Sequence, residues 1–376
     1  MAGFSFGTVI MQLSKLPTGM RYYLGEEARL RRFIEDTAMS VFTGWSYEEI
    51  LTPSVDYYQL FEQGMGPAEA QRSFRFTDSD GRLLSLRPDV TSSIARVAAT
   101  LLANRPRPLR LCYTAPVFRQ SSPSHAEWRR EHTQLGCELI GTNGIETDLE
   151  MLLLAREILH GIGLGQSSVI TINQTAIFNG IAGDLHLDPA EREILRRLVD
   201  TRDVAQLRRF VGSRSLNTET GEMLAQLCGL NGKGKVLERA RQLALGPASS
   251  VALDALDRLW QIITELDVVE SFELDLADVS NLDYYTGISF KIFVQGIGYR
   301  IGRGGRYDGL TANFGVSEPA VGFVLSLDSL TELLSRNSSS AQSDNSEVQS
   351  VKASNLSTKF KEAISRRANN QRIRIE

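Results

Sequence analysis

Phe118-Arg119-Gln120 and Gln134-Leu135-Gly136-Cys137-Glu138 are apolar-rich segments on either side of a polar stretch, residues 121–133. This pattern predicts two strands joined by a loop. Gln134 and Glu138 are an even number of residues apart, so on one strand they would point to the same face. A lone arginine on a strand is usually a surface charge. If Arg119 instead faced this glutamine and glutamate on an interior face, the three would form a pocket for a zwitterion.

Four further stretches combine polar, aromatic or glycine residues with turn signals. They are Leu86-Arg87-Pro88-Asp89-Val90-Thr91, Leu282-Asp283-Tyr284-Tyr285-Thr286-Gly287, Gly302-Arg303-Gly304-Gly305-Arg306-Tyr307-Asp308 and the apolar run over residues 320–330. Taken singly, the first could simply cap a helix, the second could be a tight hairpin, and the third fits neither phosphate-binding glycine pattern. The functional interpretation of the first is a carboxylate and a hydroxyl directed at a ligand ammonium group.

Helical and strand patterns alternate along the chain. Residues 26–42 have helical spacing, and residues 109–117 are typical of a strand. Residues 176–266 are mostly helical and are interpreted as an insertion, with Asp188-Pro189 as a good helix start. Strand patterns return at residues 272–276 and 288–294, which are expected to form two half-buried antiparallel strands.

Composition excludes several classes of protein. The 376 residues carry 41 Lys and Arg against 45 Asp and Glu, so the chain as a whole is not a basic nucleic-acid binder. The sequence contains neither a membrane-spanning apolar run nor a signal-peptide pattern. With 3 cysteines, no CxxC pair and 4 dispersed histidines, we expect reduced thiols, no metal site and no cofactor. These features predict a cytoplasmic protein.

The composition changes near residue 335, so we expect a core over residues 1–335 and two shorter segments. Residues 336–358 are polar with few apolar side chains and are predicted to be a disordered linker. Residues 359–376 form a short basic segment containing Arg366, Arg367, Arg372 and Arg374. This segment is either a solvated terminus or a docking tail, and its final Arg-Ile alternation fits a strand as well as a ragged end.

Taken together and in this order, the motifs resemble the catalytic core of histidyl-tRNA synthetase, a class II aminoacyl-tRNA synthetase, over residues 15–335. Residues 44–53, 118–141 and 322–330 resemble the three motifs of that class, and LDYYTG and GGRYDGL are similar to two histidine-specific signatures. The resemblance implies an α+β fold with an antiparallel sheet flanked by helices. It also implies self-association through the first-motif face, residues 44–53. The helical insertion matches the family only in position.

The same resemblance implies a histidine-binding pocket, most of whose positions are filled. Its residues would be Asp89, Thr91, Arg119, Gln134, Glu138, Tyr284, Tyr285 and Tyr307. Asp89, where the family usually has Glu, and Thr91 would hold the α-ammonium group. Gln134 and Glu138 would lie near the amino and imidazole groups, and the tyrosines would line the ring. A buried imidazole needs partners for its donor and its acceptor, because each unpaired group costs about 1–3 kcal/mol.

The nucleotide side departs from the family pattern. Gln120 stands where the family has Glu, and His132 falls where an aromatic ring would stack on adenine. Ser280 and Ser329 stand where the family has arginines. Amino-acid activation needs cations around a triphosphate, and each such group contributes roughly 2.7–4 kcal/mol to transition-state stabilisation. No anticodon-binding domain is recognised after residue 335, so neither aminoacylation nor tRNA binding is expected.

A filled histidine pocket beside an altered nucleotide site resembles the regulatory-subunit family of ATP phosphoribosyltransferase. Members of this family are synthetase-like chains that partner a short-form catalytic subunit in the first step of histidine biosynthesis. The resemblance implies a chain without catalytic residues. It would be required for the partner's activity and for feedback inhibition by L-histidine, within a hetero-octamer.

Three rival interpretations remain at this stage. A divergent histidine–tRNA ligase would retain adenylate formation despite Gln120, Ser280 and Ser329. A synthetase-like tRNA-binding or other regulatory module would use the basic segment, with steeply salt-dependent binding. A relative that ligates an amino acid to a different acceptor would still need adenylate formation. An assay of amino-acid activation therefore tests two of the three.

Overall fold

The computed structural model describes residues 15–120, 129–214, 218–243, 245–279, 284–338, 349–351, 356–369, 371 and 373–375. The predictions for residues 280–283, which include Ser280 and the start of the LDYYTG signature, lie outside these ranges. The chain divides into two compact units, Met1–Thr331 and Glu332–Glu376.

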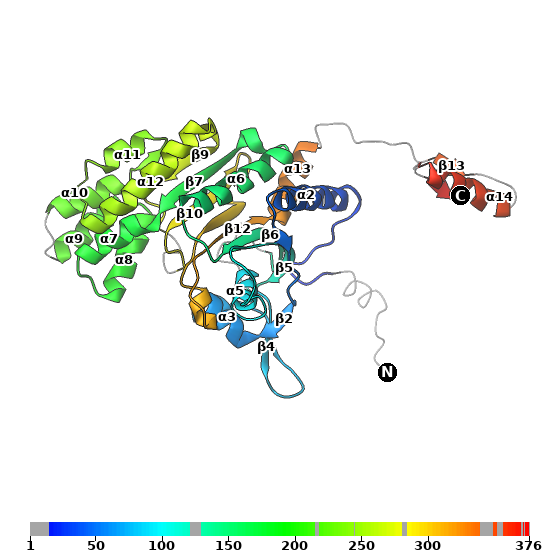
Figure 1. Ribbon diagram of the computed structural model, residues 1–376, viewed down its shortest axis with the longest axis horizontal. Helices are drawn as coiled ribbons and strands as arrows, with labels where there is room; N and C mark the ends of the chain where they lie inside the picture. The colour runs from blue at the N-terminus through cyan, green and yellow to red at the C-terminus, as the bar shows by residue number, and fades with distance from the viewer. Residues whose placement is uncertain are drawn as a thin grey trace, which may run out of the picture. The chain divides into compact units, whose positions relative to one another are not determined.

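A nine-stranded sheet forms the centre of the first unit (Figure 1). Its strands, in spatial order, are β1 (Glu48–Glu49), β5 (Leu109–Phe118), β6 (Glu131–Ile140), β12 (Ala320–Ser326), β11 (Gly302–Arg306), β10 (Ile288–Val294), β7 (Ser168–Gln174), β9 (Phe272–Asp275) and β8 (Asn231–Gly232). Neighbouring strands are antiparallel except in the pairs β1–β5 and β7–β9. The predicted α+β fold, with a mainly antiparallel sheet flanked by helices, is confirmed.

Apolar and polar side chains alternate along β6, so one face of the sheet is apolar and the other carries polar groups. Leu135, Cys137 and Leu139 point to one face and are fully buried. Gln134 and Glu138 point to the other face, as their even spacing requires. Phe118 is the last residue of β5, Arg119 and Gln120 follow it, and residues 134–138 belong to β6, which pairs with β5 in antiparallel register.

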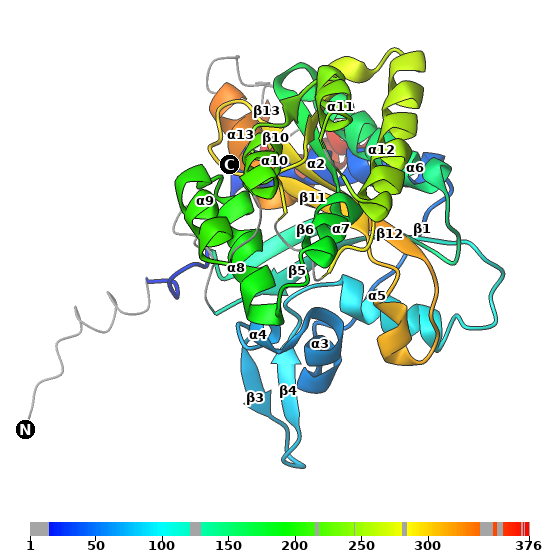
Figure 2. The ribbon, with the colours of Figure 1, turned by 90° about the vertical axis from the view of Figure 1, so that its left-hand side faces the viewer.

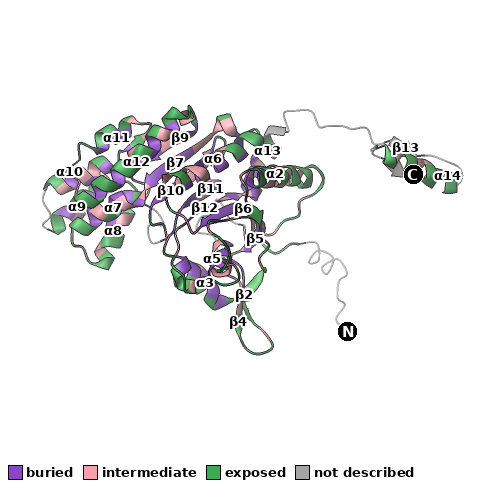
Figure 3. Cartoon of the chain, viewed as in Figure 1, coloured by how far each residue is buried: buried purple, intermediate pink, exposed green. Residues whose placement is uncertain are grey.

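Helices α2 (Gly25–Gly44) and α6 (Ile145–Gly161) cover the apolar face, and Figure 3 shows the sheet buried beneath them. Phe323 of β12 lies in this layer and is 1% exposed. Its ring centroid is 6.1 Å from that of Phe42 on α2 and 6.3 Å from that of Phe290 on β10. Burial of aromatic rings from the helix and from two strands fixes this layer on the sheet.

The opposite face carries a smaller layer. It consists of α3 (Tyr58–Met65), α4 (Pro67–Ala70), α5 (Thr91–Ala99), the 3-10 helix η4 (Thr311–Phe314) and a three-stranded sheet in the order β2 (Val55–Tyr57), β4 (Leu83–Leu86), β3 (Arg75–Thr77). Figure 2 shows β3 and β4 extending past α3. Beside this layer Gln134, Val324 and Ser326 are only half-buried, so the central strands remain partly open on this face.

The segment interpreted as a helical insertion, residues 176–266, holds a group of helices and the edge strand β8. The helices are α7 (Thr175–Asp184), α8 (Pro189–Asp200), α9 (Val204–Ser213), α10 (Thr218–Leu227), α11 (Lys235–Ala240) and α12 (Pro247–Glu265), with the 3-10 helices η2 (Gly165–Ser167) and η3 (Val269–Ser271) just outside it. Asp188 caps α8 by accepting from the backbone N–H of Glu191 at 2.9 Å, so the predicted helix start is confirmed. No helix among the described residues is long and apolar enough to cross a membrane.

The second unit contains the parallel strands β13 (Gln349–Val351) and β14 (Ile373–Ile375), with α14 (Leu356–Ala368) between them in sequence. Helix α13 (Leu327–Ser338) crosses the boundary between the units. Much of the predicted disordered linker, residues 336–358, lies outside the described ranges, but its described residues belong to α13, β13 and α14. The linker assignment of residues 336–358 stays a prediction.

The expected strands at residues 272–276 and 288–294 are present and run in opposite directions, but they are not neighbours in the sheet. β7 lies between the corresponding strands, β9 and β10. β10 is antiparallel to β7 and β11, whereas β9 is parallel to β7. Alternation of apolar and polar residues predicts each strand, but it does not specify which strand becomes the neighbour.

Phe323→Ala is expected to lower the free energy of unfolding by about 3–5 kcal/mol, because it removes a buried ring that contacts Phe42 and Phe290. Urea unfolding followed by circular dichroism measures this change. The matched control is Leu101→Ala, since Leu101 is 83% exposed and its truncation should change stability by less than about 0.5 kcal/mol. Equal effects of the two substitutions would contradict the assignment of Phe323 to the core.

Candidate functional site

A buried carboxylate, Glu138 of β6, lies at the centre of the partly open face of the sheet. It is 1% exposed and is surrounded by hydroxyl groups. Its Oε1 accepts hydrogen bonds from Thr91 Oγ1 at 2.8 Å and from Tyr113 OH at 3.3 Å. Its Oε2 accepts a hydrogen bond from Tyr307 OH. Three segments that are distant in sequence therefore meet at one side chain.

Two glycines make room for this arrangement. A Cβ atom on Gly322, which pairs with Glu138 across β12 and β6, would lie 1.8 Å from Glu138 Oε2. A Cβ atom on Gly136 would lie 2.6 Å from the Tyr113 hydroxyl oxygen. Because both positions lack side chains, the carboxylate and the phenol can lie flat on the sheet.

The electrostatics of Glu138 reflect its burial. Desolvation raises the pKa of Glu138 to about 7, although the hydrogen bonds from Tyr307, Thr91 and Tyr113 act in the opposite direction. Neutral hydroxyls stabilise a carboxylate less than a cation would. The group therefore ionises close to neutral pH.

Three tyrosines form a wall beside this carboxylate. The ring centroid of Tyr284 lies 5.1 Å from that of Tyr285, edge to face, and 5.5 Å from that of Tyr307. Tyr285 packs over Gly305, where a Cβ atom would be 2.7 Å from its ring. Burial raises the pKa values of all three phenols, which stay protonated as hydrogen-bond donors.

Asp89 and Thr91 mark the start of α5, and each has a local role. Asp89 is half-buried, and its Oδ1 accepts from the backbone N–H of Ser92 at 3.2 Å in the first turn. The capping interpretation is therefore correct for Asp89. Its other carboxylate oxygen makes no hydrogen bond to a described residue. Thr91 instead directs its hydroxyl to Glu138.

The basic side of the site contains Arg119 and Arg303. Arg119 follows β5, is half-buried, and donates from Nε to the backbone oxygen of Pro88 at 3.2 Å. Burial lowers the pKa of Arg119, and repulsion from Arg303 lowers it further. Gln134 lies between Ala115 of β5 and Ser326 of β12 in the register of the sheet.

The structure thus brings most of the predicted residues together. Thr91, Glu138 and Tyr307 are hydrogen-bonded, and Tyr284 and Tyr285 join them through ring contacts. The other three predicted residues make no hydrogen bond to that group in the described structure: Asp89 precedes α5, Arg119 follows β5, and Gln134 is on β6. Sequence reasoning missed Tyr113, although it follows the alternation of β5, and did not single out Arg303 within its glycine-rich stretch.

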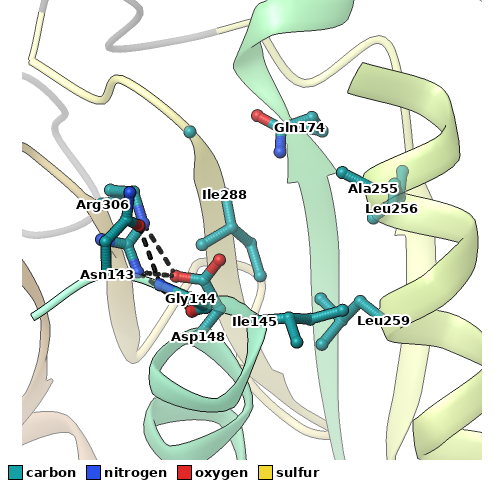
Figure 4. Close-up of a pocket in the computed structure, with 11 residues that line it drawn as sticks. Asn143, Gly144, Ile145, Asp148, Gln174, Ala255, Leu256, Leu259, Ile288 and Arg306 are labelled. Atoms are coloured by element: carbon teal, nitrogen blue, oxygen red, sulfur yellow. Dashed lines mark hydrogen bonds and ion pairs between the residues drawn. The ribbon is translucent and has the colours of Figure 1, made fainter. Parts of the chain in front are cut away.

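A pocket of about 240 Å³ lies where α6, α12, β7 and β10 meet (Figure 4). Arg306 points into it and donates to Asp148 at 2.6 Å and to Thr147 at 2.6 Å. Burial raises the pKa of Asp148 to about 6, although Arg306 lowers it. Arg306 and Tyr307 are successive residues at the end of β11, so their side chains point to opposite faces of the sheet. This pocket is therefore separate from the Glu138 site.

Asp328 lies in the segment that resembles the third motif, and its carboxylate is hydrogen-bonded to other parts of this chain. Its Oδ1 accepts from Tyr23 OH and from Arg31 at 2.8 Å, and its Oδ2 accepts from the backbone N–H of Thr133 at 2.7 Å. Burial acts to raise the pKa of Asp328, but these partners bring it below its usual value. Ser329 donates to Ser326 at 2.9 Å.

The described residues contain neither a candidate metal centre nor a reactive thiol. Among the described residues, no cluster of His, Cys, Asp and Glu is suited to hold a metal ion. Cys112, Cys137 and Cys228 are buried and free. Burial raises their pKa values, which disfavours the reactive thiolate.

The fold and this site define a class II synthetase-like protein: the family model described as histidyl-tRNA synthetase matches residues 19–330. A Thermoanaerobacter protein named ATP phosphoribosyltransferase regulatory subunit is 37% identical over 313 residues, covering 83% of this chain and 81% of that protein. A namesake from Caldanaerobacter subterraneus subsp. tengcongensis is 36% identical over 323 residues, covering 86% and 83%. The chain belongs to this family of ATP phosphoribosyltransferase regulatory subunits.

The structural comparison agrees with this assignment. A crystal structure from Bacillus halodurans is titled as an ATP phosphoribosyltransferase regulatory subunit/histidyl-tRNA synthetase. It has a TM-score of 0.86 and 28% identity, covering 97% of this chain and 93% of that one. The resemblance on which the sequence analysis rested is confirmed for both fold and family.

Glu138→Gln is expected to flatten the dependence of stability on pH. The folded chain keeps the Glu138 proton up to about pH 7, whereas the unfolded chain releases it near its ordinary pKa, so stability falls as pH rises through this window. The wild-type loss should be roughly 3 kcal/mol, most of it absent from the variant. Urea unfolding at a series of pH values measures this. Glu270→Gln, at a side chain that is 91% exposed, is the control; equal slopes in all three proteins would contradict the assignment.

Proposed function

We propose that this chain is a non-catalytic regulatory subunit required for the activity of a short-form ATP phosphoribosyltransferase catalytic subunit. It would mediate feedback inhibition by L-histidine in the first step of histidine biosynthesis, in the cytoplasm. Family membership supports the regulatory role. The observation that carries the histidine proposal is the hydroxyl-lined Glu138 beside the wall formed by Tyr284, Tyr285 and Tyr307.

The chemistry of the Glu138 group suits an imidazole. A carboxylate has about four lone-pair positions, and three are used by the hydroxyls of Thr91, Tyr113 and Tyr307. The remaining position can accept an imidazole N–H. The tyrosine faces suit a ring that carries partial or full positive charge. The uncommitted oxygen of Asp89 and the half-buried Gln134 are available for the α-ammonium group.

The nucleotide side supports the absence of aminoacylation. Activation of an amino acid requires cations that are free to contact a triphosphate. Here Arg31 donates to Asp328 and to Thr133 Oγ1, so this cation is already engaged by the protein. Ser329, at the position where the family has Arg, supplies only a hydroxyl. These contacts disfavour the rival interpretation of a divergent histidine–tRNA ligase.

Regulation requires histidine to prefer one state of the complex. We propose that histidine binds better to the inhibited state than to the active state, with a coupling of about 1–3 kcal/mol. The partner's substrates should then weaken histidine binding by the same factor, because linkage is reciprocal. Assembly into a hetero-octamer would use the first-motif face, residues 44–53, for self-association. The 81% exposure of Leu51 on that face supports this placement.

Glu138→Ala should abolish histidine inhibition in a complex reconstituted with a short-form catalytic subunit. The variant removes the acceptor at the centre of the proposed site, and because Glu138 is 1% exposed, the substitution leaves the outer surface of the chain unchanged. Activity is measured as phosphoribosyl-ATP formation over a range of histidine concentrations, and assembly by size-exclusion chromatography. Glu270→Ala serves as the control. Inhibition that is unchanged in Glu138→Ala would show that another site is the sensor.

Purified chain should give no histidine-dependent ATP–pyrophosphate exchange. The expected reason is the engaged Asp328 cluster and the missing arginine at Ser329. An active histidyl-tRNA synthetase is the positive control, and circular dichroism verifies that the chain is folded. Robust exchange would restore the ligase interpretation and overturn the non-catalytic one.

A further inference from the structure

Arg303 is a half-buried arginine of β11 that has no partner among the described residues. It makes no hydrogen bond or ion pair with any residue that the structure describes. Other half-buried arginines have acidic partners, as Arg107 has Glu318 at 2.6 Å and Arg110 has Glu150 at 2.9 Å. A half-buried guanidinium left without an anion is unfavourable unless a ligand supplies one.

The sheet register places Arg303 in the candidate site. Arg303 and Gly305 share one face of β11, and Gly305 lies beneath Tyr285. Across the sheet Arg303 pairs with Val324, which pairs with Gly136. Arg303 is therefore two residues along β11 from Gly305, which is in register with Gly322 and Glu138 on the neighbouring strands.

A second cation faces the same space. Arg119 follows the end of β5, on the far side of β6 and β12 from Arg303. Among the residues that the structure describes, its guanidinium group has one partner, the backbone oxygen of Pro88, which accepts from Nε. The two guanidinium groups are close enough that Arg303 lowers the pKa of Arg119. The half-buried Gln134 and Val324 belong to β6 and β12, the two strands between β5 and β11. Two neighbouring guanidinium groups on this side of the sheet are suited to bind an anion.

We propose that Arg303, with Arg119, binds the α-carboxylate of the amino-acid ligand, and that Arg303 makes the pocket selective for a free carboxylate. This inference rests on the proposed histidine site and adds the residue that reads the other end of the ligand. Asp89 and Glu138 supply negative charge for the ammonium and imidazole groups, so the two arginines complete the complement of a zwitterion. An arginine suits this role because its planar donors match a carboxylate.

Calorimetric titration of the full chain with L-histidine and with L-histidinol, which has a hydroxymethyl group in place of the carboxylate, tests the proposal. Wild type should bind histidine more tightly than histidinol. Arg303→Gln should weaken histidine binding about tenfold or more and leave histidinol binding within about twofold, so that the selectivity disappears. Arg303→Lys, which retains the charge but not the planar fork, should recover part of the loss. Arg32→Gln, at a side chain that is 73% exposed on α2, is the control and should match wild type.

The other outcomes separate this inference from the proposed function. Histidine binding that is unchanged in Arg303→Gln overturns the carboxylate assignment and leaves the histidine site standing. Equal losses for histidine and histidinol overturn it as well, because Arg303 would then only support the pocket. Failure of wild type to bind histidine overturns both proposals. Titration with pyrophosphate tests whether Arg303 binds a phosphate group instead of a carboxylate. Pyrophosphate binding that is lost in Arg303→Gln, while histidine binding persists, would assign Arg303 to phosphate and overturn the inference.

Discussion

A carboxylate buried on a β-sheet needs hydrogen-bond donors around it, and the need of Glu138 for donors is the constraint that organises this site. The donors come from the start of α5, from β5 and from the residue after β11, through Thr91, Tyr113 and Tyr307. They can reach one side chain only if the antiparallel register is correct and Gly136 and Gly322 leave the space open. Since the donors are neutral, Glu138 is held in place without being neutralised by a cation. It remains able to accept one more donor from a ligand.

The buried and half-buried charged groups discussed above differ in whether the protein itself supplies their partners. Asp328 has a phenol, a guanidinium and a backbone N–H around it, and Arg306 is similarly enclosed by Asp148 and Thr147. Such satisfied groups fix the packing of neighbouring elements. By contrast, one oxygen of Asp89 and the guanidinium of Arg303 have no partner among the described residues, and both border the half-open face. Satisfied charges thus occupy the position where a nucleotide-activating enzyme would need free ones, and unsatisfied charges surround the proposed amino-acid site.

Several parts of this arrangement could be predicted from the sequence, because they depend on short-range periodicity or chain stereochemistry. The even spacing of Gln134 and Glu138 placed them on one face, and Asp188-Pro189 marked a helix start. Other parts could not be predicted, because they depend on which strands become neighbours. The position of β7 between β9 and β10 follows from the packing of the whole sheet, and alternation within a strand carries no information about it. The same holds for Tyr113, whose role depends on β5 lying next to β6.

The sequence by itself determined the family, the order of the strands and helices along the chain, and the chemical types available for the site. These follow from residue identity, spacing and motif order, which are local properties. Only the tertiary structure decided that Glu138 is enclosed by hydroxyls, that Asp328 is bonded to Tyr23 and Arg31, and that Arg303 has no partner in the part of the chain that the structure describes. The physical reason is that pairing and burial are properties of positions in space. Whether a charged side chain is structural or open to a ligand depends on neighbours that the chain brings from far away in sequence.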